Sequence, residues 1–93
     1  MPTNRTIVIS FGYRHGEPPP ADMTVDLRDV QDHDYDVMEN EAKSIAKEIE
    51  PGSVVALGCE NGCNRSVHIA RLIQKHMPNI AIVDRDLSPE AAS

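Results

Sequence analysis

The chain is poor in aromatic residues, with one Phe, two Tyr and no Trp among its 93 residues. A hydrophobic core must therefore be built from aliphatic side chains, and few rings remain to stack on nucleic-acid bases. Basic residues are also few, because nine Lys and Arg stand against fifteen Asp and Glu, which gives a formal charge of −6. This charge argues against non-specific binding to nucleic acid or an anionic membrane, although it does not exclude a local basic pocket.

Cysteines and long apolar runs are scarce as well. Cys59 and Cys63 lie in one short stretch, which makes a poor disulfide framework for a secreted fold. They lack a second Cys or His pair at the spacing of a zinc site, so we expect no metal and no cofactor. No run approaches the roughly 20 apolar residues of a membrane span, and the first residues do not read as a secretory signal. We expect a cytoplasmic protein without a membrane partner.

Short apolar runs alternate with amphipathic stretches. The runs at 6–10, 23–27, 54–57 and 80–83 are rich in β-branched residues and predict strands. Two stretches carry apolar residues at the spacing of an α-helix. The first stripe is Met38, Ala42, Ile45 and Ile49, and the second is Ser66, Ile69, Ala70, Ile73 and Met77. Between these elements we expect loops at 11–16 and 28–36.

This order predicts an α/β fold. The second and third strands, and the third and fourth, are each joined through a helix, which favours right-handed parallel crossovers. We therefore expect a small, mostly parallel sheet of about four strands with helices packed on it. It would form a single domain over residues 1–87, with a flexible tail at 88–93. The route from the first strand to the second stays open, since its prolines, Pro18 to Pro20, argue only against a regular helix.

The most informative stretch follows the third predicted strand. Cys59 and Arg65 bracket five residues, Ser66 comes next, and a predicted helix begins there. This strand–loop–helix order directs backbone N–H groups and a helix N-terminus toward one point. The pattern Cys-x5-Arg-Ser resembles the phosphate-binding loop of the cysteine-dependent tyrosine phosphatases. That resemblance implies a loop whose amides surround an oxyanion, with the Arg holding two of its oxygens and the Cys beneath it.

An arginine follows each predicted strand. The four are Arg14, Arg28, Arg65 and Arg85. In a parallel sheet they would all lie at the carboxyl edge, where open α/β sheets bind ligands, so the pattern predicts an anion pocket. The alternative is that arginines pair with acids close to them in sequence, as surface groups commonly do. These acids are Asp26 and Asp29 for Arg28, and Asp84 and Asp86 for Arg85.

Further motifs extend a resemblance to one family. They are Ser-Phe-Gly-Tyr-Arg-His-Gly at 10–16, Ala21-Asp22, Asp26, Arg28, Gly58-Cys59 with Arg65-Ser66-Val67, and Arg85-Asp86. Together they resemble the C-terminal domain of the RapZ family, bacterial RNase adapters, over about residues 8–28 and 54–87. In that family the domain binds an amino-sugar phosphate and a small regulatory RNA. The anion-binding positions that the resemblance implies are Arg14, His15, Arg28, Asn61, Gly62 and Arg65.

The loop departs from the family pattern, Cys-Thr-Gly-Gly-x-His-Arg-Ser, at two positions that bear on charge. Glu60 stands where the family has Thr, and its carboxylate would repel a bound phosphate. Asn64 stands where the family has His, so one potential cation is missing.

We therefore expect a stand-alone module that binds a phosphorylated or otherwise anionic small molecule, such as an amino-sugar phosphate, with a regulatory role. The expected ligand-binding residues are Arg14, His15, Arg28, Cys59, Asn61, Gly62, Asn64, Arg65, Ser66 and Arg85. One alternative is an enzyme of the cysteine-phosphatase type that uses Cys59 and Arg65. Its acid could be Asp26, Asp84 or Asp86, and the sequence does not select one of them. Another is an adapter that binds RNA or a protein partner.

Overall fold

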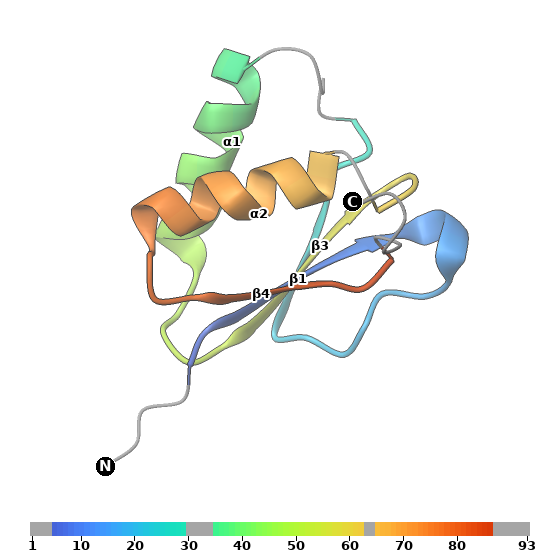
Figure 1. Cartoon of the computed structure of the whole chain (residues 1–93), viewed down its shortest axis with the longest axis horizontal. Helices are drawn as coiled ribbons and strands as arrows, with labels where there is room; N and C mark the ends of the chain where they lie inside the picture. The colour runs from blue at the N-terminus through green and yellow to red at the C-terminus, as the bar shows by residue number, and fades with distance from the viewer. Residues whose placement is uncertain (1–4, 30–34, 63–64, 87–93) are drawn as a thin grey trace.

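Strands alternate with helices along the part of the chain that the computed structural model describes, residues 5–29, 35–62 and 65–86. The elements are β1 (Ile7–Gly12), the 3-10 turn η1 (Tyr13–His15), β2 (Met23–Asp26), α1 (Tyr35–Glu48), β3 (Val54–Cys59), α2 (Arg65–His76) and β4 (Ala81–Asp84) (Figure 1). The predicted tail at 88–93, Cys63 and the predicted ligand-binding residue Asn64 all lie outside the described residues.

The four strands form one parallel sheet in the order β2-β3-β1-β4. β1 lies in the middle, where Ile7 pairs with Val54 of β3 on one side and with Ala81 of β4 on the other. The predicted α/β fold with a small parallel sheet is thus confirmed. Because β3 lies between β1 and β2, the connection that the sequence left open must pass β3. All four strands end at one edge of the sheet, the carboxyl edge, which the start of α2 also reaches (Figure 1).

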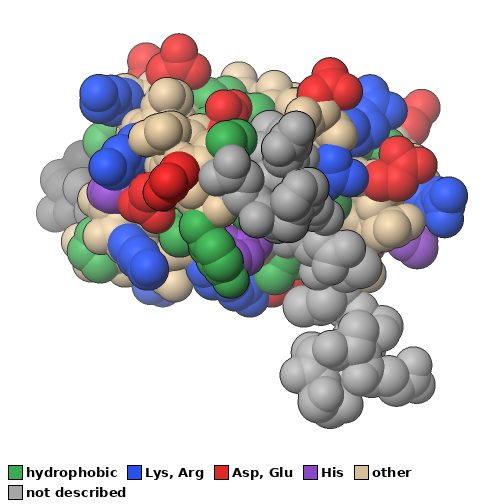
Figure 2. Space-filling model, turned by 90° about the horizontal axis from the view of Figure 1, so that it is seen from above, with side chains coloured by type: hydrophobic (Ala, Val, Ile, Leu, Met, Phe, Trp, Pro, Cys, Tyr) green, Lys and Arg blue, Asp and Glu red, His purple; other side chains and the backbone are tan. Residues whose placement is uncertain are grey.

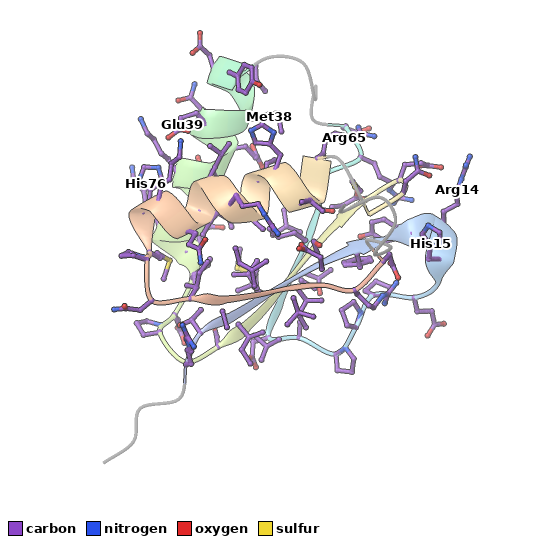
Figure 3. The ribbon with its side chains drawn as sticks, in the orientation of Figure 1. Arg14, His15, Met38, Glu39, Arg65 and His76 are labelled. Atoms are coloured by element: carbon purple, nitrogen blue, oxygen red, sulfur yellow. The ribbon has the colours of Figure 1, made fainter. Side chains whose placement is uncertain are left out.

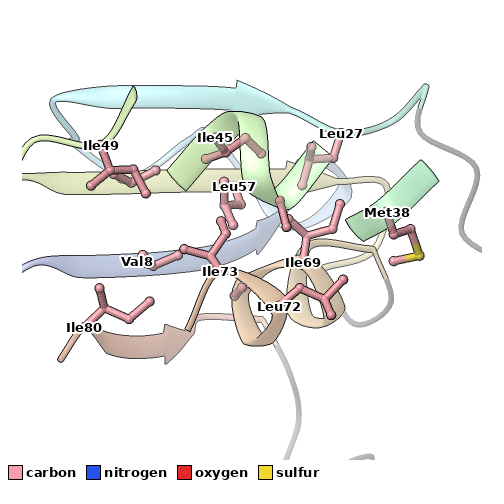
Figure 4. Close-up of a cluster of buried hydrophobic side chains, with 13 residues drawn as sticks. Val8, Leu27, Met38, Ile45, Ile49, Leu57, Ile69, Leu72, Ile73 and Ile80 are labelled. Carbon is pink, nitrogen blue, oxygen red and sulfur yellow. The ribbon is translucent and has the colours of Figure 1, made fainter. Parts of the chain in front are cut away.

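Both helices pack on the same face of the sheet. Val8 of β1 and Leu57 of β3 belong to one buried cluster with residues of both helices (Figure 4). The helical members of this cluster are Met38, Ala42, Ile45, Ile69, Ala70, Leu72 and Ile73. They include every apolar residue of both predicted stripes that falls within the helices, and Ser66 of the second stripe is buried as well. Burial of each large aliphatic side chain stabilises the fold by about 1.5–3 kcal/mol. The layer between the sheet and the two helices therefore supplies most of the core.

The opposite face carries two of the three aromatic residues, Phe11 and Tyr13, near the carboxyl edge. Phe11 is buried and its ring meets Tyr13 edge to face, with 4.9 Å between the ring centroids. Both rings lie across Gly58 of β3, where an added Cβ would stand 2.4 Å from Phe11 Cζ and 2.6 Å from Tyr13 Cε2. A side chain at Gly58 would therefore displace the rings. Since side chains alternate along a strand, Gly58 faces away from its helix-facing neighbours Leu57 and Cys59.

Several boundaries differ from the expectation by one to three residues, and two of them have a clear basis in the structure. Phe11 and Gly12 were expected in a loop, but β1 continues through both because each has a partner in β3. The carboxylate of Asp86 also accepts the N–H of Gly12, at 2.7 Å. α1 begins at Tyr35, inside the predicted loop 28–36, so the helix extends beyond the apolar stripe that predicted it.

The surface carries charges of both signs. Seen from above, acidic and basic side chains are interspersed over the molecule (Figure 2). Over the described residues, no helix is long and apolar enough to cross a membrane.

Candidate functional site

Residues 60–62, which follow β3, fold back onto the buried sulfur of Cys59. Cys59 is the last residue of β3, and its side chain faces the helices. Its Sγ accepts the backbone N–H of Gly62 at 3.2 Å and lies 3.2 Å from the hydroxyl of Ser66, in the first turn of α2. Both contacts are stronger when the sulfur carries a negative charge. The positive end of α2, next to the sulfur, favours the same charge. We call residues 59–62 the Cys59 loop.

The Cys59 loop rests on the end of β1. Gly62 has φ +76°, and an added Cβ there would lie 2.5 Å from the backbone nitrogen of Gly12. An added Cβ at Gly12 would lie 2.3 Å from the carbonyl carbon of Asn61. The N–H of Arg14 donates to the carbonyl of Glu60 at 3.1 Å. The loop's shape therefore depends on two glycines and on where β1 ends.

Arg65 connects α2 to the neighbouring strand end. It is the first residue of α2 and is partly buried. One of its terminal nitrogens donates to the backbone carbonyl of Arg28, just beyond β2. Arg65 lies at the same edge of the sheet as Arg14 and His15, which belong to η1 (Figure 3). The structure thus brings Cys59, Gly62, Arg65 and Ser66 together around one loop.

Arg28 pairs with Asp26 and lies on the aromatic face. Its guanidinium donates to both carboxylate oxygens, with the shortest contact at 2.6 Å, and it lies 3.9 Å from the centroid of the Tyr13 ring. The hydrogen bonds from Arg28 lower the pKa of Asp26. For Tyr13, burial and the nearby Asp26 raise the pKa, and the charge of Arg28 opposes them.

Arg85 is held in a similar way. It forms an ion pair with Asp86 at 2.8 Å, donates to the carbonyl of Glu17, and lies 5.2 Å from the centroid of the Phe11 ring. The local pairs that the sequence offered as the alternative are therefore formed at Arg28 and at Arg85. Both guanidinium groups stack with rings on the face away from the helices, whereas Cys59 and Ser66 meet on the helix side.

Arg14 and Glu60 form a loose pair in solvent. Arg14 Nε lies 3.7 Å from Glu60 Oε1, and the two side chains are 67% and 50% exposed. The pKa of Arg28 is raised mainly by its hydrogen bonds to Asp26, and the charge of Glu60 adds to this effect. His15 is exposed beside them on η1. Asn61 is partly buried in the Cys59 loop.

Sequence reasoning missed a link between Asp84 and Arg71. Arg71 of α2 donates to both carboxylate oxygens of Asp84, at 3.1 and 2.6 Å, and the buried hydroxyl of Ser10 donates to one of them at 2.7 Å. No local pattern joins the arginine in the middle of a helix to an acid at the end of the next strand. Asp84 is therefore engaged on the helix side of β4. Within residues 5–29, 35–62 and 65–86, no three His, Cys, Asp or Glu side chains could hold a metal ion together.

Comparison with known proteins adds no relative. The chain matches no protein-family model, and a search of curated proteins finds no significant similarity. The resemblances to RapZ and to the phosphatase loop therefore stay predictions.

Proposed function

We propose that this protein binds a small phosphorylated or carboxylated molecule at the carboxyl edge of its sheet, against the Cys59 loop and the first turn of α2. The observation that carries the proposal is the closure of the loop on Cys59 by Gly62 and Ser66. This closure places the turn at the start of a 12-residue helix, whose terminal N–H groups favour anions.

The nearby cations support an anionic ligand. Arg65 begins α2, and its side chain donates to the carbonyl of Arg28 just beyond β2. Arg14 lies on η1, and its N–H donates to the carbonyl of Glu60 in the Cys59 loop. Arg28 and Arg85 are each bound to a local carboxylate, so in this arrangement they contribute less net charge. The first compounds to test are inorganic phosphate and glucosamine-6-phosphate, because the resemblance to RapZ implies an amino-sugar phosphate.

The test is a titration followed by amide NMR shifts, with two variants on the same helix. Arg65→Ala should weaken phosphate binding by about tenfold or more, because a charge-assisted hydrogen bond contributes about 1.5–3 kcal/mol. Lys75→Ala removes an exposed cation from the last turn of α2 and should leave the affinity within about twofold. Equal losses in both variants would show only a diffuse effect of charge. Unchanged amides of Gly62 and Ser66 at millimolar phosphate would refute the proposal.

A cysteine-dependent hydrolase is the second candidate, favoured by the two polar contacts of Cys59 Sγ. Its chemistry needs an acid to protonate the leaving group, and Asp26, Asp84 and Asp86 are each bound to an arginine. The side chain of Cys59 is also buried. We therefore expect no appreciable hydrolysis of an aryl phosphate. Turnover that disappears in Cys59→Ser would establish the enzyme instead.

A further inference from the structure

Asp86 joins the ends of two strands at the carboxyl edge. Its side chain is only 12% exposed. One carboxylate oxygen accepts the N–H of Gly12, the last residue of β1, at 2.7 Å. The carboxylate also accepts hydrogen bonds from Nε of Arg85 and from one of its terminal nitrogens, the latter at 2.8 Å. The segment after β4 is thereby fixed to the end of β1.

Gly12 in turn touches the Cys59 loop. The backbone of Asn61 and Gly62 approaches so closely that no side chain fits at Gly12 or at Gly62. Two residues after Gly12, the N–H of Arg14 donates to the carbonyl of Glu60. A displacement of Gly12 would therefore move the support of the loop and the backbone that carries Arg14.

We propose that Asp86 is a positioning residue for the anion site: its carboxylate holds the end of β1 so that the Cys59 loop keeps the shape that receives the anion. This inference rests on the function proposed above. Among residues 5–29, 35–62 and 65–86, Asp86 forms hydrogen bonds with Gly12 and Arg85. Arg85 lies against Phe11 on the face away from the helices, so the effect of Asp86 on the Cys59 loop passes through the backbone of Gly12.

The charges around Asp86 give this role a pH dependence. Burial raises its pKa, but the hydrogen bonds from Arg85 and Gly12 and the charges of Arg85 and His15 outweigh burial, so the pKa lies below its ordinary value. Arg85 lies on the same segment and His15 on η1. A lowered pKa means that the support is complete above about pH 4, near the ordinary Asp value, and is lost as the pH falls through the lower pKa of the folded state.

Three variants of the full chain test the inference. Asp86→Ala removes the acceptor for Gly12, whereas Asp86→Asn keeps a carbonyl oxygen in its place and removes the charge. Asp22→Ala is the matched control, since Asp22 accepts the N–H of Val54 at 2.8 Å near the opposite edge of the sheet. The affinity for inorganic phosphate and the amide shifts of Gly12, Arg14 and Gly62 are measured for each form between pH 2.5 and 7.

We expect Asp86→Ala to weaken phosphate binding by about tenfold, Asp86→Asn to restore it to within about threefold, and Asp22→Ala to leave it unchanged. In the unliganded wild type, the three amides should titrate with one midpoint below pH 4, and this step should be missing in Asp86→Asn. If the amide shift of Gly62 is the same in the wild type and in both Asp86 variants, the inference is wrong. Should Asp86→Ala fail to fold, Asp86→Asn still provides this test. If the three amides titrate together but phosphate binds to no form, the proposed function fails while the coupling from Asp86 to the loop stands.

Discussion

The contact between Asp84, Ser10 and Arg71 makes the clearest stability prediction. Ser10 lies in the middle of β1 with no exposed surface, and its hydroxyl donates to Asp84. Asp84→Ala leaves that buried hydroxyl without its acceptor, which costs about 1–3 kcal/mol. Loss of the pair with Arg71 adds at most about 1 kcal/mol, since the Arg71 side chain is 48% exposed.

The expected loss of unfolding free energy is therefore about 1–4 kcal/mol. For a chain of this size each kcal/mol corresponds to about 4–8 °C, so the melting temperature should fall by roughly 5–30 °C. Circular dichroism needs no Trp probe, and it gives the unfolding free energy from urea denaturation and the melting temperature from a thermal scan. Asp29→Ala, which removes an exposed acid after β2, should change stability by less than about 0.5 kcal/mol.

The pH dependence and a double mutant separate the contributions at Asp84. Burial raises the pKa of Asp84, but the hydrogen bonds from Arg71 and Ser10 and the charge of Arg71 outweigh it, so the pKa is lowered. Its ionised form therefore stabilises the fold above about pH 4, and this part is lost as the pH falls through the lower folded-state pKa. Ser10→Ala combined with Asp84→Ala should lose less than the sum of the single changes, because no buried hydroxyl is left without a partner. Additive losses, or a loss below about 0.5 kcal/mol in Asp84→Ala, would refute this reasoning.

Two further substitutions test the Cys59 loop. Gly62→Ala should lower the unfolding free energy by about 2–4 kcal/mol in urea denaturation, because φ is positive and the Cβ would meet the backbone of Gly12. Gly16 also has a positive φ, +140°, but an added Cβ there would meet no atom nearer than 4.0 Å, so Gly16→Ala should lose less. Equal losses would contradict the role of the Gly12 contact. Glu60→Thr should strengthen glucosamine-6-phosphate binding by about two- to tenfold in calorimetry, because it removes a negative charge and an exposed ion pair with Arg14. Unchanged affinity would mean that Glu60 does not act on the ligand.

Periodicity was sufficient to predict the fold. The helix stripes begun by Met38 and by Ser66 lie on α1 and α2, and the β-branched runs lie on the four strands. The boundaries at Phe11 and Tyr35 were wrong because they depend on tertiary partners. Phe11 continues β1 since Gly58 lies opposite it in β3, a pairing that one stretch of sequence does not contain.

The gathering of the candidate residues at one edge of the sheet was predictable from the sequence, but the face of the sheet on which each side chain lies was not. Parallel strands do bring Arg14, Arg28, Arg65 and Arg85 to one edge, as their places in the sequence indicated. The sequence did not show that Arg28 and Arg85 would lie against Tyr13 and Phe11 on the face away from the helices. This arrangement depends on Gly58, whose lack of a side chain leaves room for both rings. It also gave no sign of the link from Arg71 to Asp84, which are thirteen residues apart in different elements.

The two faces of the sheet together show how an acidic chain could accommodate the proposed anion site. Asp26 and Asp86 hold their arginines against Tyr13 and Phe11, so these four charges largely cancel on the face away from the helices. On the helix side the Cys59 loop meets the positive end of α2, where Arg65 begins the helix. Backbone N–H groups and one guanidinium can then bind an anion locally, although the formal charge of the whole chain is −6. The long-range field would slow the approach of an anion, so its association rate should rise with salt as screening increases, whereas a basic surface would give the opposite dependence.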